Sequence, residues 1–241
     1  MKKISIFLFA LSLVMSVCTS CDDGRIYEKT VVTTEEGRVL KLTGEITGLS
    51  SWGDTYSVVV AGYSDESDYA VITKALPANH VDGEPLQLVM NGISEEVKTL
   101  KLCVINRLRK SIVDFRTLEE ADLLSATDTI RMNIGTLDVD MYHSIQAHVF
   151  DLNCTSCHGQ STYAAAGLFL TEGKSYDALV NKHSDRNTEM LLVAPGDVEQ
   201  SFLHVVLHNN NVISHDHLDI LSGKTELLDL VDSWIKNGAQ Q

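Results

Sequence analysis

Five consecutive residues, Cys154-Thr155-Ser156-Cys157-His158, form the most specific chemical pattern in the sequence. Two thiols separated by two residues can each add to a vinyl group of one haem, and the imidazole of the next residue can then bind the iron. The spacing therefore predicts one covalently bound haem c, with Cys154 and Cys157 as the attachment points and His158 as the proximal iron ligand.

Two other uses of such a cysteine pair fit the sequence less well. A zinc site normally needs a second pair of ligands at a defined spacing, and only scattered histidines could supply it here. A thioredoxin-like dithiol lies at the start of a helix after a βαβ unit, whereas a helix is predicted directly before Cys154. Haem attachment is the favoured interpretation.

The N-terminus predicts export. Lys2 and Lys3 precede an apolar run over residues 4–17, which is followed by small and polar residues. This is the order of regions in a signal peptide, and the run is too short to span a bilayer as a stable helix. We expect residues 1–20 to be a lipoprotein signal peptide and residues 21–30 to be a linker.

The end of this segment, Cys18-Thr19-Ser20-Cys21, resembles the lipobox of bacterial lipoproteins. Cys21 is the better candidate for lipidation, because Ser20 precedes it, whereas Val17 before Cys18 is an awkward residue at a cleaved bond. The family prefers leucine where Cys18 stands. The resemblance implies attachment to a membrane through a lipid anchor at Cys21, on the periplasmic face or at the outer membrane surface.

Length and composition limit the possible partners. The chain has 241 residues, 44% of them hydrophobic, so it can bury one or two cores. Its net charge of -14 makes nucleic acid a poor partner. Such an acidic surface could steer a basic redox partner protein, although acidity also serves solubility alone.

Residues 31–135 are predicted to form strands. Apolar and polar residues alternate over residues 39–46 and again over 56–60. Further strands are expected at residues 69–73, 86–90, 97–105, 111–115 and 129–134. Seven or eight short strands over about a hundred residues favour a β-sandwich of immunoglobulin-like kind. Cys103, within one of these strands, is expected to be a buried structural thiol.

After Gly135 the periodicity becomes helical. Helices are predicted at residues 141–153, from Ser175 to 180 with the serine as N-cap, after Pro195, and at residues 224–236. The predicted fold class is therefore multidomain, with a β-sandwich over residues 31–135 followed by an all-α domain over residues 136–241.

Residues 141–240 resemble a single-haem domain of the cytochrome c superfamily. Beyond the Cys-His pattern, the resemblance is carried by Ala166-Gly167-Leu168-x-Leu170, Tyr176-x-x-Leu179, Pro195-Gly196-Asp197 with Ser201 and Leu203, and Trp234-Ile235-x-x-Gly238-Ala239. The residues before 136 do not contribute to it. The resemblance implies an all-α cytochrome c domain that binds haem c and exchanges electrons with redox partner proteins.

The chain departs from this family at the expected sixth iron ligand. Relatives usually place a methionine in Met-Pro-Pro before the last helix, but residues 212–219 contain neither methionine nor proline. His215 and His217 bracket the expected distance to Trp234. We favour His217 as distal ligand, because apolar residues beside it could pack on a haem face, with His215 and Met190 as alternatives.

The remaining histidines give weaker signals. His204 and His208, four residues apart on a predicted helix, could hold a metal ion, but their polar surroundings favour exposure. His143, His148 and His183 are expected to have no functional role.

Two axial histidines would leave no open position for a substrate, so a non-catalytic electron carrier between respiratory components is favoured over an enzyme. Two alternatives stay open: a haem-containing subunit of an exported oxidoreductase complex, and a surface binding module with an accessory haem.

Overall fold

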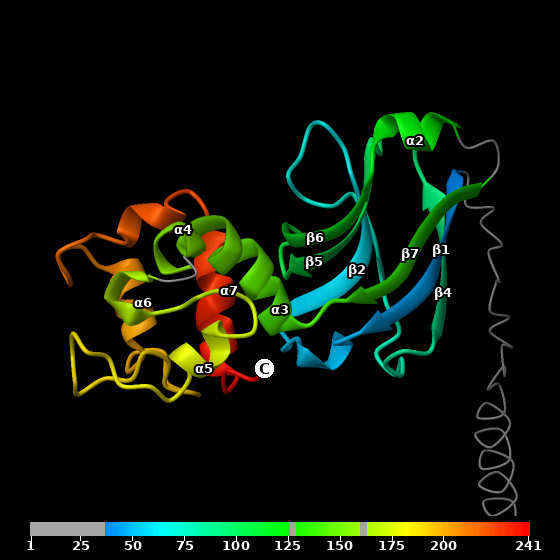
Figure 1. The fold of residues 1–241 in the computed structure, drawn as a ribbon. Coiled ribbons are helices and arrows are strands. Elements are labelled where there is room, and N and C mark those ends of the chain that lie inside the picture. The colour runs from blue at the N-terminus through cyan, green and yellow to red at the C-terminus, as the bar shows by residue number, and fades with distance from the viewer. Residues whose placement is uncertain (1–36, 126–128, 160–162) are drawn as a thin grey trace, which may run out of the picture. The chain divides into compact units, whose positions relative to one another are not determined.

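The computed structural model describes residues 37–125, 129–159 and 163–241 (Figure 1). The predicted signal peptide, the linker and the lipidation candidate Cys21 lie outside these ranges. Residues Glu35–Gln241 form one compact unit. No helix in the described ranges has the length and apolar character needed to cross a membrane.

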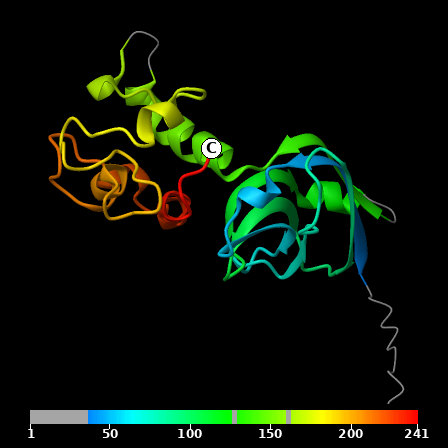
Figure 2. The same ribbon diagram turned by 90° about the horizontal axis from the view of Figure 1, so that it is seen from below.

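Seven strands within the described ranges form two sheets. The first sheet has the order β4-β1-β7 and the second the order β3-β2-β5-β6. The strands are β1 (Arg38–Thr47), β2 (Tyr56–Tyr63), β3 (Ile72–Ala75), β4 (Pro85–Ile93), β5 (Thr99–Asn106), β6 (Ser111–Leu118) and β7 (Thr129–Asp138). β1 pairs antiparallel with β4 and parallel with β7, whereas the second sheet is antiparallel throughout. The two sheets enclose a common interior (Figure 2).

Alternating side chains explain why segments such as β1 and β4 form strands. In β1, Leu40, Leu42 and Ile46 are fully buried, while the intervening residues are partly or fully exposed. Because successive side chains of a strand point to opposite faces, this pattern buries one face of the sheet. The predicted strands are confirmed, with small shifts at their ends.

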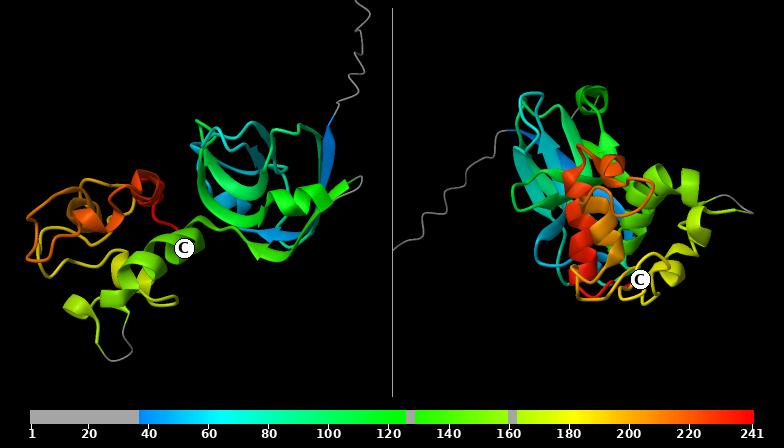
Figure 3. Two further views of the ribbon diagram at one scale, coloured as in Figure 1. Left: turned by 90° about the horizontal axis from the view of Figure 1, so that it is seen from above. Right: turned by 90° about the vertical axis from the view of Figure 1, so that its left-hand side faces the viewer.

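The segments after β7 are short helices joined by irregular chain. They are α3 (Met141–Ile145), the π-helical η2 (Gln146–Cys154), α4 (Thr155–His158), η3 (Ala165–Gly167), α5 (Ser175–Leu179), α6 (Phe202–His208), η4 (Leu218–Leu221) and α7 (Thr225–Lys236). The strands and these helical segments form two groups along the chain (Figure 3). Two further short helices, η1 (Leu49–Ser51) and α2 (Glu120–Ser125), lie between strands, and α2 was not predicted.

The predicted fold class is wrong. The part of the chain that the structure describes is mixed α/β, with two sheets and short helices, and no all-α cytochrome domain is evident in it. Irregular chain fills most of the stretch between α5 and α6, where it is held by isolated bridges such as His183 with Leu191. The helical periodicity of short segments therefore indicated the helices correctly. It did not show whether the domain is built only from helices.

One hydrophobic core continues from the sheets into the helical segments. It includes Leu42 of β1 and Leu102 of β5 together with Ile145 of α3 and Trp234 of α7. Trp52, in the loop before β2, donates a hydrogen bond of 2.6 Å from Nε1 to the carbonyl of Val139. Burial of apolar area across this shared core stabilises the sheets and the helices together.

Candidate functional site

The Cys-His sequence lies where two helical segments meet. η2 ends at Cys154, and α4 carries Cys157 and His158. Asn153, just before the first cysteine, donates from Nδ2 to the carbonyl of Val149 at 2.8 Å, and its Oδ1 accepts a hydrogen bond of 2.8 Å from Lys224 Nζ. The start of the pattern is therefore tied both to η2 and to the segment that leads into α7.

The two thiols differ in their surroundings. Cys157 is exposed, whereas Cys154 is partly buried, and both are free thiols. Burial raises the pKa of the Cys154 thiol to about 11, and the nearby Asp151 carboxylate adds to this effect. A redox dithiol needs a thiolate of lowered pKa at its nucleophilic cysteine. The raised pKa of Cys154 is the opposite of what the nucleophilic cysteine of a redox dithiol requires.

The His158 ring is oriented by a backbone carbonyl. Its Nδ1 lies 3.2 Å from the carbonyl oxygen of Leu168, and the backbone carbonyl of His158 accepts a bond of 2.7 Å from the amide of Leu170. When Nδ1 carries the proton and donates to Leu168, Nε2 keeps a free lone pair. A metal-binding imidazole is usually held in this tautomer by such a contact.

His217 has the same arrangement. Its Nδ1 lies 2.8 Å from the carbonyl oxygen of His215, which leaves Nε2 as the lone-pair nitrogen. Burial lowers the pKa of His217, and the neighbouring imidazoles of His215 and His158 lower it further. A lowered pKa favours the neutral imidazole, which is the form that binds a metal ion.

The structure brings these two imidazoles together. The ring centroids of His158 and His217 are 6.2 Å apart, with the planes inclined by 39°. A first-row metal ion binds an imidazole nitrogen at about 2.0–2.1 Å, so two imidazoles on opposite sides of one ion have centroids about 6 Å apart. The separation of His158 and His217 would therefore allow both imidazoles to bind one metal ion.

The other two candidates for the distal ligand have different positions. His215 is exposed, and its ring packs edge-on against that of His217 with centroids 5.2 Å apart. Met190 is half-buried and packs against the hydrophobic core. Of the three candidates, His217 is the one whose ring lies beside the ring of His158.

A buried glutamine holds the chain that follows the Cys-His sequence. Gln146 is 4% exposed, and its Nε2 donates to Asp151 Oδ1 at 2.7 Å and to the carbonyl of Leu170 at 2.9 Å. Ser175 donates to Gln146 Oε1 and contacts the hydroxyl of Tyr142. Ser175 is thus a buried hydrogen-bonding residue, and the expectation that it caps α5 is wrong, because Lys174 occupies the N-cap position.

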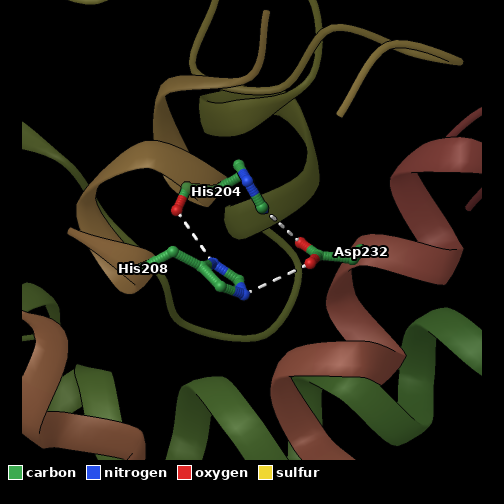
Figure 4. Close-up of side chains that lie close together, drawn as sticks. All are labelled: His204, His208 and Asp232. Carbon is green, nitrogen blue, oxygen red and sulfur yellow. Dashed lines mark hydrogen bonds and ion pairs between the residues drawn. The ribbon is translucent and has the colours of Figure 1, made fainter. Parts of the chain in front are cut away.

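A second cluster lies on α6 and α7. Among the residues described, the one group of three or more metal-binding side chains with converging ligand atoms is His204, His208 and Asp232 (Figure 4). The spacing of the two histidines was visible in the sequence, but the carboxylate comes from another helix and was not predicted. Cys154 and Cys157 belong to no such group in the described ranges.

The remaining expectations concern isolated side chains. Cys103 is fully buried, and burial raises the pKa of its thiol to about 11, as expected for a structural cysteine. His143 pairs with Asp138, and His183 is exposed. His148 is half-buried, and its burial lowers its pKa.

Comparison of the chain with known protein families, with curated proteins and with solved structures found no match. The function is therefore inferred from the chain's own residues and their geometry.

Proposed function

We propose that this protein carries one covalently attached haem c and transfers single electrons. Cys154 and Cys157 would hold the haem through thioether bonds, and His158 and His217 would bind its iron. Such a group supplies a reversible one-electron couple when bound. The proposal does not depend on an all-α domain, because short helices and the loop of residues 209–217 supply all four residues.

One observation carries the proposal: the imidazoles of His158 and His217 lie at a separation suited to a shared iron. Both rings also have Nδ1 at a backbone carbonyl, at 3.2 Å for His158 and 2.8 Å for His217. A single histidine with this contact is common. Two such histidines at this separation, one of them directly following Cys-x-x-Cys, support axial ligation by both.

These two ligands favour an electron carrier over an enzyme that works at the iron. With both axial positions taken by the protein, no position is open for a substrate or a gas. The protein's part is to hold both imidazoles neutral and fixed through Leu168 and His215, so that little rearrangement accompanies a change of charge. Two imidazoles also stabilise ferric iron more than an imidazole and a thioether do, so a low potential is expected.

The place of action is proposed from the N-terminal sequence. The basic and apolar residues of 1–20 and the cysteine at position 21 support export and a lipid anchor in the cell envelope. Acidic residues exceed basic ones, 33 to 19, which supports a partner with a basic docking surface.

The coordination can be tested on the purified protein after expression with a haem-maturation system. The electron paramagnetic resonance spectrum of the oxidised protein should show low-spin ferric iron, because two nitrogen ligands give a strong axial field. A predominantly high-spin spectrum would mean an open or weakly bound sixth position, and would overturn the assignment of an electron carrier with two histidine ligands.

A further inference from the structure

The side chains of His204, His208 and Asp232 converge at a place outside the proposed haem site (Figure 4). Their ligand atoms all lie within 4.8 Å of one another. His204 and His208 are on one face of α6 because they are separated by about one helical turn. Asp232 approaches them from α7, so two helices contribute to one cluster.

The distances suit a metal ion with little rearrangement. Asp232 Oδ1 lies 2.9 Å from His204 Nδ1, and Asp232 Oδ2 lies 3.4 Å from His208 Nε2. Two ligand atoms bound to one ion at about 2.0–2.1 Å, with an angle between octahedral and tetrahedral, are about 2.9–3.4 Å apart. Both histidine-carboxylate distances fall in this interval.

The hydrogen bond of the His208 ring to the backbone determines which of its nitrogens faces Asp232. Its Nδ1 lies 3.0 Å from the backbone carbonyl oxygen of His204, an acceptor, so Nδ1 must carry a proton to make this bond. In the neutral ring, Nε2 then presents a lone pair to the carboxylate of Asp232. Two acceptors in this arrangement repel each other unless a proton or a metal ion lies between them. The backbone contact is also the one that orients metal-binding histidines.

The local charge favours a cation. Asp229 lies one turn before Asp232 on α7, and its pKa is raised by burial and by the negative charges of Asp232 and Glu226. The three site side chains are 16% exposed for His204, 31% for His208 and 23% for Asp232, so the cluster is open to ions from solvent. Nearby carboxylates lower the energy of a bound divalent ion.

We propose that His204, His208 and Asp232 form a binding site for one zinc-class divalent transition-metal ion. Two imidazole nitrogens and a carboxylate, which faces His204 with Oδ1 and His208 with Oδ2, are ligands that Zn²⁺ accepts, and the partial exposure leaves room for water as a further ligand. The site is distinct from the proposed haem site in both its residues and its chemistry.

The test is isothermal titration of the full-length protein with Zn²⁺ alone, with wild type and variants prepared in the same haem state. The single variants H204Q, H208Q and D232N remove one ligand each. The control is H143Q, which removes a histidine that also pairs with an aspartate, Asp138, but has no third ligand in the described cluster. Zinc that binds elsewhere, for example to thiols, binds equally to wild type and variants and therefore does not affect the difference between them.

Wild type and H143Q should bind one more Zn²⁺ per chain than the three site variants, or bind it at least about tenfold more tightly. The zinc that wild type binds beyond the amount bound by D232N should show nitrogen and oxygen neighbours at about 2.0–2.1 Å in X-ray absorption, and no sulfur at about 2.3 Å. Equal stoichiometry and affinity in all five proteins, or zinc bound through sulfur alone, would overturn the proposal. Neither result depends on whether haem is attached.

Discussion

The imidazole rings of His158 and His217 lie with their centroids 6.2 Å apart, although one ring belongs to α4 and the other to the loop before η4. Each ring has its Nδ1 at a backbone carbonyl, that of Leu168 for His158 and that of His215 for His217. The two lone-pair nitrogens are thereby left for a shared ligand.

Replacing His217 with alanine should open the sixth position of the iron. We expect H217A to retain the covalent haem, because Cys154, Cys157 and His158 are unchanged, but to shift from low-spin to largely high-spin iron in its absorption spectrum. H215A is the matched control, since it removes a neighbouring exposed histidine. It should stay low-spin, because His217 Nδ1 donates its orienting hydrogen bond to the backbone carbonyl of His215, which the substitution leaves in place. A high-spin H215A with a low-spin H217A would reverse the assignment.

Replacing His217 with methionine should raise the reduction potential. A thioether stabilises ferrous iron relative to an imidazole, so H217M should be easier to reduce than the wild type. A redox titration followed by absorption gives the two potentials. The control is M190L, which keeps an apolar side chain at the other candidate position and should leave the potential unchanged. If M190L shifts the potential and H217M does not, Met190 is the ligand.

The side chain of Gln146 should contribute measurably to stability. Q146A removes its bonds to Asp151 and to the carbonyl of Leu170 and leaves Ser175 without its acceptor. Because Gln146, Leu170 and Ser175 are buried, we expect a loss of about 1–3 kcal/mol in the free energy of unfolding. Urea denaturation measures it. Q200A, at an exposed position, should stay within about 0.5 kcal/mol of the wild type.

Stability should fall as the pH is lowered through the ordinary pKa of histidine. Burial lowers the pKa of His148, so the unfolded chain takes up a proton at a higher pH than the folded chain does. The contribution of His148 is therefore fully present above pH 6.5, the pKa of the unfolded side chain, and is lost as the pH falls from there through the folded pKa. Because the ring is half-exposed, we expect only part of the about 1.4 kcal/mol that one pKa unit represents.

Urea denaturation at pH 5 and pH 7.5 checks this dependence. H148Q should show a smaller difference between the two conditions than the wild type, whereas H183Q, which changes an exposed histidine, should keep the wild-type difference. An H148Q protein with the full wild-type pH dependence would show that other groups cause it.

The strands could be predicted from the sequence because their burial is local information. Each residue of β1 or β4 faces inward or outward according to its position in the strand, so the alternation of apolar side chains along these strands reflects the fold directly. The short helices could be located for a similar reason. Their assembly could not, because the continuous core joins Leu42 and Leu102 to Trp234, and contacts at such separations leave no periodic signal.

The candidate site was predictable to the extent that its residues are neighbours in the chain. Cys154, Cys157 and His158 define a pattern by themselves, and His217 was inferred from its distance to Trp234. Asp232 could not be inferred, since nothing in the sequence links it to His204 before α6 and α7 are packed together. The prediction that Ser175 is an N-cap was wrong for the same reason: its hydrogen-bond partner Gln146 lies in another helical segment.

The most direct test of covalent haem attachment is the intact mass of the polypeptide under denaturing conditions. Protein expressed with a haem-maturation system should be red, and its mass should exceed that of the processed chain by one haem, which stays on the polypeptide after unfolding. The C154S/C157S variant should lack this added mass. A colourless wild-type protein, or haem that dissociates on denaturation, would contradict the account.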